Sequence, residues 1–168
     1  LVPEISLTPQ TVDRFIARFG QDKIAVLHSK LSVGERYDQW YKIKSGKAKI
    51  VIGARSAIFA PVEDLGIIII DEEHDNSYKS EMTPRFHARD VAKFRCVKND
   101  AFLLLSSATP SVETYKNAID GKYAFVKLTE RFGKAVLPEV KTVDISNSKS
   151  VISNELYSEI EEVLANNK

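Results

Sequence analysis

The sequence has 168 residues, of which 43% are hydrophobic and 28% charged, enough for one domain with a substantial core and a small appendage. The formal net charge of +1 excludes a nucleic-acid binder that works through its overall charge, so binding of phosphates must come from local basic patches. The single cysteine, Cys96, excludes an internal disulfide and a multi-cysteine zinc site, and no apolar stretch approaches the roughly 20 residues of a transmembrane helix. Leu1 already lies in an apolar segment, so we expect the natural start of the protein upstream.

Two helices with clear cap signals are expected in the first third of the chain. Thr8 suits the N-cap of a helix over residues 9–19. Ser32 and Glu35 have capping-box spacing and open a second helix over residues 32–45. The apolar side chains of the second helix recur at helical spacing and are expected to face inward: Val33, Tyr37, Trp40 and Tyr41.

Three more helices are expected further along the chain. The first covers residues 85–97 and places three cations four residues apart on one face: Arg85, Arg89 and Lys93. Thr109 is the expected cap of a helix over residues 110–119. Ser153 is the expected cap of a final helix with an inward apolar face: Leu156, Ile160, Val163 and Leu164.

Short apolar runs between these helices predict strands. The four isoleucines of residues 67–70 show no alternation, so we expect a central strand buried on both faces. Residues 123–129 alternate and predict a half-buried edge strand. The other expected strands are residues 1–2, 24–27, 50–52, 101–105 and 138–145. This order predicts an α/β fold, with a mainly parallel sheet covered by helices on both faces.

The run of isoleucines ends in an acidic turn. Asp71 and Glu72 follow it directly, and ligands of open α/β sheets bind outside the carboxyl ends of the strands. A pair of carboxylates there can hold Mg²⁺ and position a water molecule. The alternative is a buried strand that ends in a solvated acidic turn.

Several segments resemble one group of motor proteins. Residues 71–74, Asp-Glu-Glu-His, resemble the Walker B box of DExH-type superfamily 2 helicases, and residues 107–109, Ser-Ala-Thr, resemble their motif III. Three more segments are similar to the PriA family of replication-restart helicases: residues 1–10, 53–61 and 85–90. Phe86 departs from this pattern, where a tyrosine is expected in many relatives. The resemblance covers essentially the whole chain and implies a partial RecA-like P-loop NTPase motor domain.

The resemblance also implies roles for the acidic turn. Asp71 would hold Mg²⁺ through its water shell, and Glu72 would orient the water that attacks the γ-phosphate of ATP. His74 would couple Walker B to motif III by hydrogen bonding toward Ser107 or Thr109, or it would be a satisfied structural group. Glu73 has no assigned role and is expected to be solvated.

DNA-binding residues follow from the same resemblance. Residues of the matching segments 1–10 and 53–61, and of an aromatic-rich loop over residues 78–87, would contact phosphates or stack on bases of single-stranded DNA. The alternative is an exposed loop that leads into an ordinary amphipathic helix. The expected DNA-binding residues are Pro3, Glu4, Gly53, Arg55, Ser56, Tyr78, Lys79, Arg85, Phe86, His87 and Arg89.

A P-loop is missing from the sequence, which contains no Gly-x-x-x-x-Gly-Lys-Ser/Thr segment. In the family it precedes the segment that begins at Leu1. We therefore expect an incomplete first motor domain over residues 1–136, with motifs Ia, Ib, II and III, and the linker and first helix of a second motor domain over residues 137–168. The ATP and Mg²⁺ site would be incomplete, and the strand over residues 101–105 would have a free edge that invites self-association.

The expected function is therefore that of a fragment of an ATP-dependent DNA helicase of replication restart, inactive in isolation. The resemblance implies as partners single-stranded and branched DNA, primosome proteins and single-strand-binding proteins, with a bacterial cytoplasmic location, no membrane, and zinc only outside this chain. The alternatives are another superfamily 2 translocase, such as a restriction motor subunit, and a non-catalytic interaction domain without a P-loop.

Overall fold

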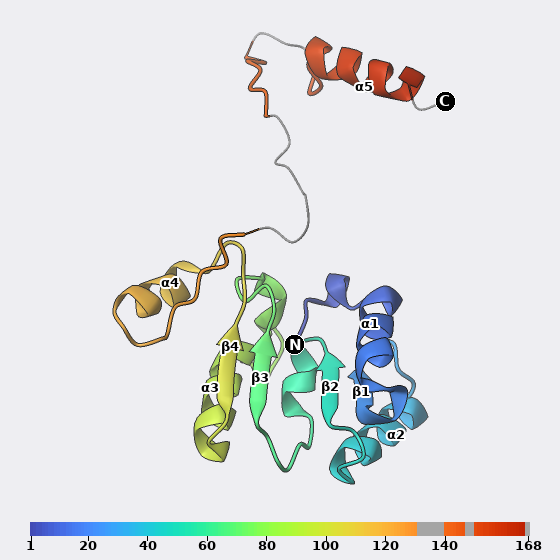
Figure 1. The fold of residues 1–168 in the computed structure, drawn as a ribbon, viewed down its shortest axis with the longest axis vertical. Helices are drawn as coiled ribbons and strands as arrows, with labels where there is room; N and C mark the ends of the chain where they lie inside the picture. Colours follow the sequence, from blue (N-terminus) through green and yellow to red (C-terminus); the bar gives the residue numbers. More distant parts are fainter. Residues whose placement is uncertain (131–139, 147–149, 167–168) are drawn as a thin grey trace. The chain divides into compact units, whose positions relative to one another are not determined.

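The computed structural model of the chain describes residues 1–130, 140–146 and 150–166. Its internal contacts divide it into two units, Leu1–Phe125 and Val126–Lys168. The first unit alternates strands with helices (Figure 1), and its strands pair in parallel, which confirms the expected α/β class. Within the described residues, no helix is long and apolar enough to cross a membrane.

Four short strands form two parallel pairs in the first unit. β1 (Ile24–Leu27) pairs with β2 (Ile50–Gly53), and β3 (Ile67–Ile70) pairs with β4 (Phe102–Leu105). These bounds lie within one residue of the expected runs, because short apolar runs bounded by polar residues are a clear strand signal. The ends of β3 and β4 are level with each other, since Ile70 lies opposite Leu105. The residues that follow the two strands are therefore neighbours.

The first two residues of the chain join the two pairs. The Leu1 nitrogen donates to the Ile69 carbonyl, and the Val2 nitrogen donates to the Gly53 carbonyl at 3.0 Å. Figure 1 places the N-terminus between β2 and β3. Residues 1–2 thus make the hydrogen bonds of the expected strand end, although they are too short to form a strand. Among the described residues β4 has only β3 as a strand partner, so self-association through its other edge stays a prediction.

The first two helices begin and end close to the expected residues. α1 (Pro9–Phe19) is capped by the Thr8 hydroxyl, which accepts a hydrogen bond from the first turn. α2 (Val33–Lys44) begins with the complete capping box of Ser32 and Glu35. The turns between elements include four short 3₁₀ helices: η1 (Glu4–Ser6), η2 (Gln21–Lys23), η3 (Arg55–Phe59) and η4 (Asn76–Tyr78).

The expected inward face of α2 is wrong. Ile43 is the buried residue of this helix, at 3% exposure. Tyr37 and Trp40 instead stack on each other outside the core, with ring centroids 6.4 Å apart. The four residues expected inside are exposed by 88% (Val33), 63% (Tyr37), 44% (Trp40) and 56% (Tyr41).

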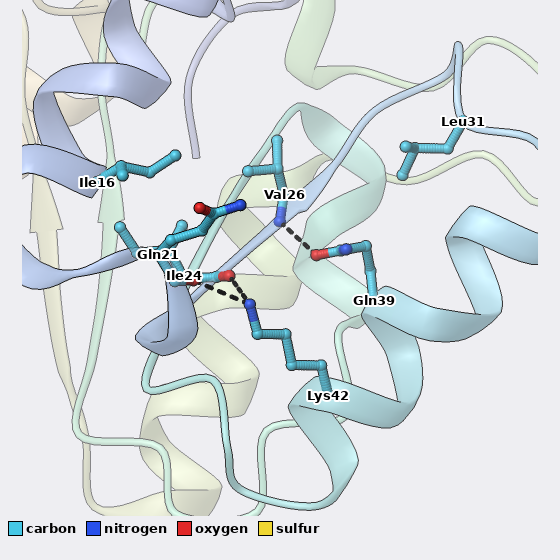
Figure 2. Close-up of a pocket in the computed structure, with 7 residues that line it drawn as sticks. All are labelled: Ile16, Gln21, Ile24, Val26, Leu31, Gln39 and Lys42. Atoms are coloured by element: carbon cyan, nitrogen blue, oxygen red, sulfur yellow. Dashed lines mark hydrogen bonds between the residues drawn. The ribbon is translucent and has the colours of Figure 1, made fainter.

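Polar side chains of α2 take the place of those rings against the sheet (Figure 2). Gln39 Oε1 accepts a hydrogen bond from the Val26 nitrogen at 3.1 Å, and Lys42 Nζ donates to the Ile24 carbonyl at 2.7 Å. β1 pairs only with β2 among the described strands, so its other edge carries free backbone groups. The orientation of α2 satisfies these groups, which protects the edge of the sheet.

α3 (Ala88–Asn99) begins three residues later than expected. His87 is its N-cap, because the His87 Nδ1 atom accepts a hydrogen bond from the Arg89 nitrogen at 3.2 Å. Arg85 therefore precedes the helix, and the expected row of three cations on one helical face is not formed.

α4 (Val112–Ile119) also begins later than expected. Ser111 replaces Thr109 as the cap, since the Ser111 hydroxyl accepts a hydrogen bond from the Thr114 nitrogen at 3.3 Å. Both residue types can cap a helix, so composition alone did not distinguish them.

α3 packs against one face of the β3–β4 pair. Ile68 and Ile70 of β3 point to this face and are 8% and 0% exposed. They belong to a core cluster that also contains Ile58, Tyr78, Ala88, Ala92 and Cys96. On the other face Ile67 and Ile69 are 52% and 45% exposed. The expected burial of β3 on both faces is therefore wrong for this chain, because the described elements cover only one face.

The second unit contains one described helix, α5 (Asn154–Asn166), and Ser153 caps it as expected. Its apolar residues Leu156, Ile160, Val163 and Leu164 are 43% to 65% exposed, so the expected inward face is not buried within the described residues. Residues 123–129 and 140–145 do not form strands, and neither segment joins the described sheets. Residues 138 and 139 of the strand expected over residues 138–145 lie outside the described residues, as does the domain boundary expected after residue 136.

Gly53 at the end of β2 provides a stability test. A Cβ atom there would lie 2.4 Å from the Leu27 carbonyl oxygen and 2.6 Å from the Ala57 Cβ. We expect Gly53→Ala to destabilise the chain by about 1–3 kcal/mol through overpacking. Gly34→Ala in α2 is the control, since a Cβ there meets nothing within 4 Å. Urea denaturation of both variants measures the difference, and equal midpoints would contradict this packing.

Candidate active site

The acidic turn follows β3 and lies beside the residues that follow β4. Asp71 and Glu72 are both partly exposed. The Ser106 hydroxyl donates to Asp71 Oδ1 at 3.1 Å. This contact follows from the register, because Asp71 and Ser106 each come directly after a paired strand residue. The turn therefore presents carboxylate oxygens at the carboxyl end of a parallel pair, where the sequence predicts a site.

Glu72 has a left-handed backbone with φ of 47°. This conformation is rare for a residue with a side chain and costs on the order of 1–3 kcal/mol, so the surrounding structure must hold it. Its neighbours are fixed on both sides: the Tyr78 hydroxyl donates to the Asp71 carbonyl at 2.7 Å, and the Glu73 nitrogen donates to the Ser106 carbonyl at 3.0 Å. The backbone from which the Glu72 side chain extends is thus restrained by hydrogen bonds of both flanking residues.

His74 connects the acidic turn to the segment after β4. Its Nδ1 atom lies 2.7 Å from Ser107 Oγ and 3.5 Å from Glu72 Oε2. The hydrogen bond expected toward Ser107 or Thr109 is therefore present with Ser107. Thr109 is exposed, and its backbone nitrogen donates a hydrogen bond to the Ser107 hydroxyl at 3.0 Å. The coupling role of these residues stays a prediction.

Glu73 is buried, not solvated as expected, with 2% exposure. Glu73 Oε2 lies 2.8 Å from Arg89 Nη1 and accepts from the Thr114 hydroxyl at 2.9 Å, while Oε1 accepts from the Ser111 nitrogen at 2.6 Å. Arg89 Nη1 also contacts the hydroxyls of Ser111 and Thr114, at 2.8 and 2.9 Å. We call these four residues the Glu73 cluster. It joins the acidic turn to α3 and to the start of α4.

The hydrogen bonds of the Glu73 cluster keep the Glu73 carboxylate ionised. Burial, the largest single influence, raises its pKa. Hydrogen bonds from the Ser111 nitrogen, Thr114, Arg89 and the Ser111 hydroxyl act in the opposite direction and together outweigh burial. The net result is a pKa below the usual range, so the ion pair with Arg89 persists at neutral pH.

Arg55 links η3 to the aromatic-rich loop. Its Nη1 atom donates to the Ser77 carbonyl at 3.0 Å and also to the Lys79 carbonyl. The Arg55 guanidinium lies 5.9 Å from the Phe86 ring centroid, and the Phe59 and Phe86 rings meet edge to face at 5.0 Å. Two segments that were expected to bind DNA therefore form one basic and aromatic surface.

Other expected DNA ligands lie elsewhere. Tyr78 has 0% exposure, and burial followed by the Asp71 and Asp75 carboxylates raises its pKa above the usual range. It is a core residue, so stacking on a base would require it to leave the core. Pro3 and Gly53 are also buried, and Arg89 turns toward Glu73 with 15% of its side chain exposed. The remaining expected ligands are exposed (Glu4, Ser56, Lys79 and Arg85) or partly exposed (Arg55, Phe86 and His87).

Comparison with known proteins assigns a family to this arrangement. The sequence pattern of DEAD/DEAH box helicases matches residues 1–118, which contain β1 to β4, the acidic turn and Ser107. The chain belongs to the DEAD/DEAH box helicase family. The RecA-like fold of this family agrees with the parallel strand pairs and with the position of the acidic turn.

Within the helicase family the chain is similar to proteins named replication restart protein PriA. It is 50% identical to that of Bacillus subtilis and 46% identical to that of Synechocystis, over 98% of this chain in both cases. It is 46% identical to that of Treponema pallidum over 95% of this chain. The resemblance expected from the motifs is confirmed. The chain spans about a fifth of the length of these relatives, 21% to 24%.

The acidic turn fits Mg²⁺ of the kind that accompanies a nucleotide. Mg²⁺ keeps most of its water ligands and uses one or two carboxylates together with phosphates. Asp71 offers such a carboxylate, oriented by Ser106. No group of three or more metal-ligating side chains occurs among the described residues, so a metal cage made only of protein ligands is not built here. Cys96 is a buried free thiol.

Sequence reasoning missed three contributors to this site. Ser106 could have been found, because the parallel register places it level with Asp71. Ser111 and Thr114 could not, because only the packing of α4 brings them to Glu73, 38 and 41 residues earlier in the chain.

Proposed function

We propose that this chain is part of a longer ATP-driven DNA helicase of the PriA type and carries the water-activating half of its ATP site. The observation that carries the proposal is the placement of Asp71 and Glu72 at the end of β3 with His74 bonded to Ser107 at 2.7 Å. Acidic residues at this position and a polar bridge to the next strand are what phosphoryl transfer and its coupling require.

The chemistry assigned to the turn is hydrolysis of the terminal phosphoanhydride bond of ATP. Glu72 orients a water molecule and accepts its proton as the water oxygen attacks the γ-phosphorus. Asp71 would hold Mg²⁺ through bound water, and the ion would neutralise charge on the phosphates. The restrained backbone on both sides of Glu72 supports this role, because it fixes the point from which the carboxylate reaches the water.

Coupling to DNA is assigned to the surface of Arg55, Lys79, Arg85 and Phe86. Cations and aromatic rings on one surface suit sequence-independent binding of single-stranded DNA. The loop that carries this surface leaves the acidic turn at Asp75 and ends at His87, where α3 begins. If the loop shifts when DNA binds, the shift would therefore displace the residues next to Glu72. The proposal includes the partners and the location expected above. These are single-stranded and forked DNA, primosome proteins, single-strand-binding proteins and the bacterial cytoplasm.

The experiment that tests the proposal compares this chain with the longer protein that contains it. We expect the longer protein to hydrolyse ATP faster with single-stranded DNA, and the chain alone to be inactive because its sequence has no P-loop to bind the phosphates. A phosphate-release assay with and without oligonucleotide measures both. DNA-stimulated hydrolysis by the purified chain, or none by the longer protein, would overturn the proposal.

A further inference from the structure

The Glu73 cluster combines the buried Glu73, which follows Glu72 in the chain, with three partly buried partners. It lies outside the surface proposed to bind DNA. The Glu73 carboxylate accepts hydrogen bonds from two separate helices, through Arg89 of α3 and through Ser111 and Thr114 at the start of α4. All three contacts are 2.9 Å or shorter. They connect Glu73 of the acidic turn to α3 and to the start of α4.

Glu72 needs such an anchor, because its left-handed backbone is not one that a glutamate adopts freely. On its N-terminal side the turn is held by Tyr78, through the Asp71 carbonyl. On its C-terminal side the backbone bond from Glu73 to Ser106 and the Glu73 cluster are the restraints. Loss of the cluster would remove the side-chain restraints on this side, where only two backbone bonds would remain: from the Glu73 nitrogen to the Ser106 carbonyl and from the Asp75 nitrogen to the Glu72 carbonyl.

We propose that Glu73 and Arg89 are positioning residues for ATP hydrolysis, which hold the Glu72 carboxylate in the direction needed to orient the attacking water. The inference rests on the proposed function. It replaces the expectation that Arg89 binds DNA, since the Arg89 side chain is 15% exposed and its Nη1 atom contacts Glu73, Ser111 and Thr114.

The test uses Glu73→Gln, Arg89→Ala and Arg89→Lys in the longer protein. Glu73→Gln keeps the shape of the side chain but removes the charge, and Arg89→Ala leaves the carboxylate without its cation. For both we expect kcat of DNA-stimulated ATP hydrolysis to fall about 10- to 100-fold, the loss that a small displacement of a reacting group causes. The KM for ATP and the Kd for single-stranded DNA should stay within about twofold, as for changes that act on the chemical step alone.

Arg89→Lys should recover most of the activity. The contacts of Arg89 with the cluster run through Nη1, and its buried Nε has no hydrogen-bond partner, so one ammonium group can replace what the guanidinium provides. Lys98→Ala is the matched control, because it removes an exposed cation from the same helix. Titration of nucleotide-binding sites corrects kcat for any unfolded fraction, so a merely structural role would leave the corrected kcat unchanged.

The outcomes separate this inference from the function on which it rests. Wild-type longer protein without DNA-stimulated hydrolysis would refute the proposed function. A second outcome would refute the inference alone. In it, DNA stimulates hydrolysis by the wild type, Arg89→Ala weakens DNA binding, and Glu73→Gln leaves kcat unchanged. Arg89 would then be a DNA ligand. An unchanged corrected kcat in both variants would likewise overturn it.

Discussion

Replacing Glu72 by glutamine in the longer protein should lower ATP turnover by about 10²- to 10⁴-fold, the usual contribution of a general base. The amide has nearly the shape of the carboxylate but cannot accept the proton of the attacking water. Glu72 is partly exposed, and its carboxylate lies 3.5 Å from His74 Nδ1, a distance at which the two groups interact weakly. The fold should therefore survive the change, and a phosphate-release assay should record a loss of kcat without a loss of stability.

Glu113→Gln is the control for this prediction. Glu113 is an exposed residue in the first turn of α4, and the same chemical change there should leave turnover unchanged. Affinity for single-stranded DNA, measured by fluorescence anisotropy, should be the same in wild type and in Glu72→Gln. Turnover within a factor of two of wild type in Glu72→Gln would remove Glu72 from the mechanism.

Tyr78→Ala should cost this chain about 3–5 kcal/mol of unfolding free energy, the usual loss for a large buried ring. Tyr78 has 0% exposure and packs in the cluster that joins β3 to α3. Its hydroxyl also donates to the Asp71 carbonyl at 2.7 Å, so the cavity would lie directly under the acidic turn. Thermal melting followed by circular dichroism measures the loss.

Tyr78→Phe separates the ring from the hydroxyl. It keeps the packing and removes one hydrogen bond to the partly exposed Asp71, so we expect a loss of about 0.5–1.5 kcal/mol, the usual net contribution of a hydrogen bond. An exposed loop tyrosine that stacks on DNA would behave differently: Tyr78→Ala would then leave the melting temperature unchanged and weaken DNA binding. That result would contradict the buried position of Tyr78.

The strands β1 to β4 and the first two helices could be predicted because their signals are local. Apolar runs between polar residues marked β1 to β4 to within one residue, and the Ser32 and Glu35 pair marked the start of α2. The motifs at the ends of β3 and β4 identified the family, because the order of residues after a buried strand is also local information. Both kinds of signal are independent of how distant elements pack.

Burial was predicted less well, because it depends on elements that are far apart in sequence. Ile67 and Ile69 are as apolar as Ile68 and Ile70, but only one face of β3 is covered among the described residues. The aromatic residues of α2 were expected inside, whereas the free edge of β1 favours Gln39 and Lys42 against it. Periodicity gives the angle between side chains, not which side of a helix meets the sheet.

The candidate site shows the same division. Asp71, Glu72, His74 and Ser107 were all selected from the sequence, and the structure brings them together at the ends of β3 and β4. Glu73 was expected to be solvated because charged residues are mostly exposed, and the family resemblance implied that Arg89 and Tyr78 contact DNA. The packing of α3 against β3 buries Tyr78, and the packing of α3 and α4 beside the turn brings Glu73 and Arg89 together.

The central claim is tested most directly by the stimulation of ATP turnover by DNA. The quantity measured is turnover with single-stranded DNA divided by turnover without it, in the longer protein, for wild type and for His74→Ala. The claim is that the residues from Asp71 to His74 take part in ATP hydrolysis, and that the contact of His74 with Ser107 makes the rate of hydrolysis depend on DNA binding. We expect a ratio well above one in wild type and a ratio near one in His74→Ala, with turnover in the absence of DNA retained. An equal ratio in the two proteins, or a ratio of one in wild type, would contradict the claim.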